Sequence, residues 1–131
     1  GWFEREVHAP LREDDATAAI TAMWRNTEAY FHSGGRVCLV GAFALDETRS
    51  RYAGAIAAHF VRWIDALAGA LVRAGAGRVE AVMMAEEVVS RIQGALVLSR
   101  ALDDKGVFKR LLDNARRHVE ASVSQAAASR A

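Results

Sequence analysis

Apolar residues recur at spacings of three and four along almost the whole chain, which places them on one face of an α-helix. Alanine is abundant, proline occurs once, and neither Asn-Gly nor Asp-Gly, the strongest short-range β-hairpin signals, is present. No linker, repeat or low-complexity tract divides the pattern. The sequence therefore predicts one all-α domain over residues 1–131, with six helices.

The first two helices are predicted on either side of an acidic run. The opening from Trp2 to Leu11 already has one apolar helical face. Because the chain has no initiator Met and begins within this pattern, we expect a preceding segment to be missing. The second helix should follow the carboxylates of residues 13–15, which favour a helix N-terminus, and end at Gly34 and Gly35.

The stretch from Val37 to Leu45 is the longest apolar run, with nine residues. A run of this length fits either a buried strand or a buried helix, because short continuous apolar segments carry no diagnostic period. We interpret it as a buried helix, since the rest of the chain is helical.

Three longer helices are predicted in the second half of the chain. The fourth follows Arg51 and ends at Gly75 and Gly77. The fifth runs from Arg78 to Leu102, and the sixth runs from Asp104 to Ala121 before a frayed Ser/Ala-rich end. The fifth helix is apolar around almost its whole circumference, so it must be buried on more than one side. A second copy of the chain would cover the surplus apolar surface, which predicts a homodimer.

Composition narrows the class of protein. The chain has 131 residues, with 17 basic and 16 acidic side chains and a net charge of +1. This balance argues against DNA binding by the chain itself, because phosphate contacts depend on Lys and Arg. One cysteine excludes an intrachain disulfide. With no signal peptide and no apolar run near the roughly 20 residues of a membrane helix, we expect a soluble cytoplasmic protein.

Candidate catalytic and metal-binding groups are isolated. No histidine has another His or Cys at metal-ligand spacing, and Cys38 lies in the most apolar run, where a thiol packs as a small hydrophobe. The paired glycines lack phosphate-loop spacing. Glu87 and Arg91 have the spacing of a surface ion pair, whereas Glu86 either faces a cavity or lies on an exposed edge. We therefore expect neither an enzyme nor a resident metal or cofactor.

Four segments in order carry a family resemblance. They are residues 37–46 (VCLVGAFALD), residues 60–63 (FVRW) with the leucines that follow, residues 92–101 (IQGALVLSRA), and Phe108. Together they resemble the C-terminal domain of tetracycline-repressor (TetR) family regulators, in the branch of lincomycin-resistance and multidrug-responsive repressors. The opening of the chain resembles the later half of that family's connecting helix.

The resemblance implies a homodimer whose last two helices form an intersubunit four-helix bundle. Small residues such as Gly94 would let the two backbones approach closely. The family's N-terminal helix-turn-helix domain is absent from this chain, through truncation or proteolysis, so operator DNA would be bound only by the parent protein. The expected dimer-interface residues are Val89, Gly94, Val97, Leu111, Ala115 and Val119.

The resemblance also implies a ligand site between the connecting helix and the middle helices. The expected ligand-binding residues are Trp24, Thr27, Phe31, Phe60, Trp63, Met84 and Gln93. Aromatic rings and Met side chains suit hydrophobic or aromatic small molecules, and Gln93 adds one amide. The expected function is that of a sensing domain whose ligand releases the parent repressor from its operator. A structural dimerisation module with a filled core is the alternative, and a small helical enzyme is a weaker one.

Overall fold

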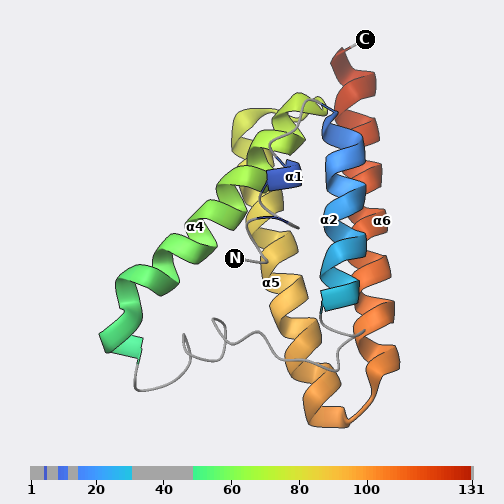
Figure 1. Cartoon of the computed structure of the whole chain (residues 1–131). Coiled ribbons are helices and arrows are strands. Elements are labelled where there is room, and N and C mark those ends of the chain that lie inside the picture. The colour runs from blue at the N-terminus through green and yellow to red at the C-terminus, as the bar shows by residue number, and fades with distance from the viewer. Residues whose placement is uncertain (1–4, 6–8, 12–14, 31–48, 131) are drawn as a thin grey trace.

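The computed structural model describes Arg5 and residues 9–11, 15–30 and 49–130 of the chain. Every regular element in these residues is helical, which confirms the all-α class. The elements, labelled as in Figure 1, are α1 (Ala9–Leu11), α2 (Ala16–Tyr30), α4 (Arg49–Arg73), α5 (Arg78–Leu102) and α6 (Lys105–Arg130). The helix predicted over residues 37–45 lies outside the described residues, so the count of six helices stays a prediction.

The helices pack around one core. Figure 1 shows α5 and α6 as an antiparallel pair, with α4 packed on α5 near the turn that joins them. From that turn α4 diverges toward its N-terminus, while α2 lies beside α6 and also contacts α4. The largest fully buried side chains include Trp63 of α4, Met23 of α2, Ile92 of α5 and Phe108 of α6. Each long helix therefore contributes to the same core.

The helix ends follow from the residues predicted to terminate them. After α4, Gly75 adopts a left-handed φ of 119°. The Gly75 N–H donates to the Val72 carbonyl, and the Ala76 N–H donates to the Leu71 carbonyl, both at 3.0 Å. This hydrogen-bond pattern is a Schellman motif, which satisfies the last carbonyls of the helix. The prediction that α4 ends at these glycines is confirmed.

Replacing Gly75 with alanine should destabilise the chain by about 1–2 kcal/mol, because a Cβ disfavours the left-handed conformation. Gly54→Ala is the matched control. It lies inside α4, and no atom lies within 4 Å of an added Cβ, so alanine should stabilise the helix by about 0.5–1 kcal/mol. Urea denaturation of both variants measures the difference. Equal effects would contradict the role given to Gly75.

The predicted end of the sixth helix is wrong. We expected it at Ala121, but α6 continues to Arg130. Two serines of this segment fit the helix because their hydroxyls donate back to carbonyls one turn earlier. Ser122 donates to the His118 carbonyl at 2.9 Å, and Ser129 to the Gln125 carbonyl at 3.0 Å. Alanine, the best helix former, makes up much of the remainder.

Among the described helices, one qualifies as a membrane span by length and composition. The stretch Ala53–Arg73 is sufficiently long and apolar. Counting uninterrupted apolar residues missed it, because Arg62 and Asp65 divide the segment. This is weak evidence, since core helices of soluble proteins pass the same test. Trp63 and Leu67 on this helix are fully buried in the core of the chain.

Candidate functional site

Helix α2 holds two of the expected ligand-binding residues on its buried face. The helix begins after Asp15, whose Oδ1 accepts a hydrogen bond from the Ala18 N–H at 3.0 Å as an N-cap. Trp24 and Thr27 lie three residues apart, hence on one side of the helix. Both are almost fully buried, so the structure places them in the interior as predicted.

The polar atoms of these two side chains have no hydrogen-bond partner among the described residues. Within the described part of the chain, neither the Trp24 indole Nε1 nor the Thr27 hydroxyl makes a hydrogen bond. Leaving a buried polar group unpaired costs about 1–3 kcal/mol. Native cores contain few such groups, and each one calls for a physical explanation, such as a bound molecule.

Helix α4 contributes aromatic side chains to the same core. Trp63 is fully buried, and Phe60 is half-buried and packs against the core cluster that also contains Trp24. The His59 ring lies edge-on to Phe60 and Trp63, with centroid distances of 5.1 and 6.1 Å. His59 lies one turn before Trp63 near the apolar face of α4, and this spacing predicts a histidine that lines the core, in agreement with the ring contacts.

Helix α5 does not bring its two expected ligand-binding residues together. Met84 and Gln93 are nine residues apart, which places them about half a turn apart around the helix. Met84 lines a pocket of about 490 Å³ with Glu80, the turn at Gly75–Gly77 and the last turns of α6. The Gln93 Nε2 atom is buried without a hydrogen-bond partner in the described residues. Phe31 lies outside those residues.

A smaller pocket lies between α2 and α6. It has a volume of about 240 Å³, below the 300–1,000 Å³ that is usual for drug-sized ligands. Ile20, one turn before Trp24, lines it, although the sequence analysis did not single this residue out. The lining residues are Thr17, Ile20, Thr21, Trp24, Ala74, Val119, Glu120, Val123 and Ser124.

The expected dimer-interface residues divide into two groups. Gly94 and Val97 are exposed and Leu111 is half-buried, so a partner can reach them. Val89, Ala115 and Val119 instead belong to the core of this chain, because the apolar stripe of α6 packs against α5 and α2. These three are therefore unavailable to a partner in this fold. The exposed large apolar residues of α5 are Val79, Met83, Val97, Leu98 and Leu102.

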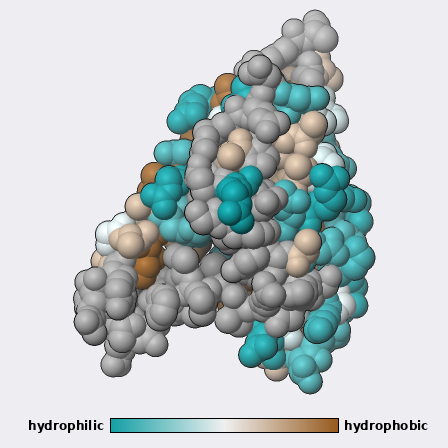
Figure 2. All heavy atoms as spheres, viewed as in Figure 1, coloured by the Kyte–Doolittle hydropathy of each residue, from teal (hydrophilic) through white to brown (hydrophobic). Residues whose placement is uncertain are grey.

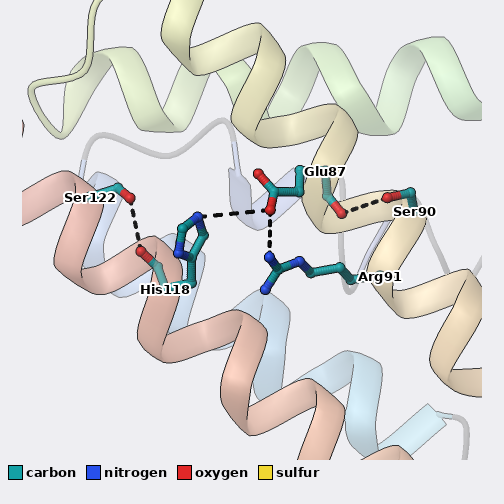
Figure 3. A network of polar contacts seen from close by, with 5 residues as sticks. All are labelled: Glu87, Ser90, Arg91, His118 and Ser122. Carbon is teal, nitrogen blue, oxygen red and sulfur yellow. Dashed lines mark hydrogen bonds and ion pairs between the residues drawn. The ribbon is translucent and has the colours of Figure 1, made fainter.

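A polar cluster joins α5 to α6 (Figure 3). Glu87 Oε1 lies 2.5 Å from Arg91 Nη2 and 3.8 Å from His118 Nε2 of α6. The predicted ion pair between Glu87 and Arg91 is confirmed. All three side chains are about half-exposed, so the cluster adds little to stability. Glu86 is exposed, so of its two predicted positions the exposed edge is the one observed.

The side of the molecule formed by α2 and α6 carries mostly polar side chains. Figure 2 shows that the side formed by α2 and α6 is mostly hydrophilic in this view. Ion pairs lie on that side: Lys109 Nζ of α6 is 3.4 Å from Glu28 Oε1 of α2 and 3.6 Å from Asp113 Oδ2 of α6. Among the described residues, no group of three or more His, Cys, Asp or Glu residues is arranged to hold a metal ion.

Comparison with known proteins gives one match. A family model described as the C-terminal domain of LmrA/YxaF-like transcriptional regulators matches residues 16–114, well over half of the chain. No curated protein and no solved structure matches. The matched range begins with α2 and ends within α6, so it contains Trp24, Thr27 and the whole of α5. The chain therefore belongs to the LmrA/YxaF-like regulators of the TetR family, as their C-terminal domain.

Proposed function

We propose that this chain is the small-molecule-sensing and dimerisation domain of a cytoplasmic transcriptional repressor. Binding of a hydrophobic or aromatic effector would release the parent protein from its operator. The chain acts by binding, without catalysis. The observation that carries this proposal is the pair of unpaired polar atoms on Trp24 and Thr27, buried beside aromatic side chains in a regulator domain.

The proposed switch uses the contact between α1 and α4. Arg73, at the end of α4, donates a hydrogen bond to the Leu11 carbonyl of α1. We propose two conformations of the chain that differ in the position of α4. An effector held between α2 and α4 would bind one conformation more tightly than the other, and this difference in affinity shifts the equilibrium between them. Since α1 precedes α2 on the side of the family's DNA-binding domain, a change in α4 would reach that domain through α1.

The proposed dimer interface is the exposed apolar surface of α5, which we call the α5 face. It consists of Met83, Gly94, Val97, Leu98 and Leu102. No atom of the same chain lies within 4 Å of a Cβ added at Gly94, so a partner backbone has room to approach there. Leu111 of α6 borders this surface in the proposed dimer.

An effector screen tests the proposal. We expect a compound that quenches tryptophan fluorescence also to raise the melting temperature. A ligand at 100 times its dissociation constant increases the free energy of unfolding by about 2.7 kcal/mol. The same compound should weaken operator binding by the complete regulator by roughly 5–150-fold, which is the usual range of allosteric coupling.

The structural-module alternative predicts a different result in the same experiment. If the core were filled without a ligand, a broad screen would give neither quenching nor a thermal shift. Operator binding is measured by fluorescence anisotropy, and the 131-residue chain is the negative control. Its net charge of +1 leads us to expect no saturable, sequence-dependent DNA binding by the chain alone.

A further inference from the structure

The buried polar atoms of the core share one chemical character. The Trp24 indole is a donor only, and the Thr27 hydroxyl can also donate. The unpaired end of Gln93 is its amide nitrogen, another donor. Among the described residues, the polar or charged side chains that are buried are Thr27 and Ser99 alone. Ser99 donates to the Asp104 carbonyl at the α5–α6 turn, so its hydroxyl serves the fold.

We infer that the effector is an uncharged molecule that presents a hydrogen-bond acceptor, such as a carbonyl oxygen, to the Trp24 N–H and the Thr27 O–H. This inference rests on the proposed function and specifies its ligand. A charged ligand would find no buried counter-charge in the described core, and an uncompensated buried charge is strongly unfavourable. A purely hydrocarbon ligand would leave both donors unpaired.

The two donors are held on a rigid support. Side chains three residues apart on a helix have Cβ atoms about 5–6 Å apart, and both belong to the buried face of α2. Asp15 caps the start of α2, and Glu28 near its end pairs with Lys109 of α6. A carbonyl oxygen has two lone pairs, so one such atom can accept from both donors. Donors fixed before binding lose little freedom when the ligand arrives.

Thr27→Val and Trp24→Phe separate this role from a structural one. Each removes a polar atom and keeps most of the side-chain volume. In the free chain Thr27→Val should raise the melting temperature by roughly 4 °C, because an unpaired buried hydroxyl is removed. Trp24→Phe also leaves a small cavity, which offsets the gain from removing its unpaired N–H. The same changes should weaken binding of an acceptor-bearing ligand. A threonine that only fills the core would not combine a higher melting temperature with weaker ligand binding.

The test uses two probes with the same ring frame, 9-fluorenone, which has a carbonyl group, and fluorene, which lacks it. Calorimetric titration of the 131-residue chain should give tighter binding of fluorenone than of fluorene. Thr27→Val and Trp24→Phe should each reduce fluorenone affinity about tenfold and leave fluorene affinity unchanged or higher. Ser90→Ala, which removes an exposed hydroxyl of α5 that lines neither pocket, should leave the preference for fluorenone intact.

Three results would overturn the inference. They are absence of fluorenone binding, equal affinity of the wild-type chain for both probes, and a loss in Ser90→Ala as large as that in Thr27→Val. Each of these leaves the proposed function standing if the effector screen yields a ligand. The proposed function itself fails only when that screen gives neither quenching nor a thermal shift.

Discussion

Leu98→Glu is expected to convert the chain from a homodimer into a monomer of 14.2 kDa. Leu98 is 46% exposed and neighbours Val97, which is 57% exposed, on the α5 face. A two-fold interface repeats each substitution, so two carboxylates would be buried without partners. If each leucine contributes about 2 kcal/mol, the dissociation constant should rise on the order of a thousandfold. Light scattering across a concentration series measures the mass.

Val61→Glu is the matched control for this experiment. Val61 is 53% exposed but lies on α4, outside the α5 face, so this variant should remain dimeric. Gly94→Leu should also weaken the dimer, whereas Gly54→Leu on α4 should not. A wild-type chain that is monomeric at micromolar concentration, or equal dissociation of Val61→Glu and Leu98→Glu, would refute the interface.

Phe108→Ala should lower the free energy of unfolding by about 3–5 kcal/mol. Phe108 is fully buried in the first turn of α6 and is among the largest side chains of the core. Its removal deletes an aromatic side chain and leaves a cavity that rigid neighbouring helices cannot close. A loss of this size is a large fraction of the 5–15 kcal/mol that stabilises a typical domain.

Urea denaturation at one fixed protein concentration measures this loss, because dimerisation makes apparent stability depend on concentration. Val61→Ala is the control, since an exposed side chain of α4 should change stability by no more than about 0.5 kcal/mol. A Phe108→Ala variant as stable as Val61→Ala would mean that the core does not depend on this ring.

Helix limits were predictable where strong terminators stand in the sequence. The predicted limits of the fifth helix agree with α5 as observed, Arg78–Leu102. Gly77 is the N-cap of this helix, and Asp103 after its last residue adopts a left-handed φ of 49°. A left-handed residue ends a helix, so the turn residues in the sequence predicted both limits correctly. The end of α6 has no such terminator, and judging it from serine content alone gave a helix that was too short.

Which side of a helix faces its own core is harder to predict from one sequence. An apolar stripe looks the same whether its partner is another helix of the chain or a second copy. Val89, Ala115 and Val119 were therefore assigned to a partner, although they belong to this chain's core.

The candidate ligand residues show what local spacing can and cannot predict. The three-residue spacing of Trp24 and Thr27 placed both on one face, as observed. The nine-residue spacing of Met84 and Gln93 was itself evidence against a shared face. Spacing could not predict that the Trp24 indole N–H and the Thr27 hydroxyl have no partner among the described residues, because this depends on tertiary packing.

The unbroken course of α6 has a practical consequence for sensor engineering. Its last turns project beyond the other helices in Figure 1 and remain helical to Arg130. A fluorescent reporter joined to α6 through a continuous helical linker would rotate with the helix axis, with each added residue turning it by about 100° and moving it about 1.5 Å. Adding linker residues one at a time would therefore tune the distance and angle between two reporters in a dimer, and hence the energy transfer between them.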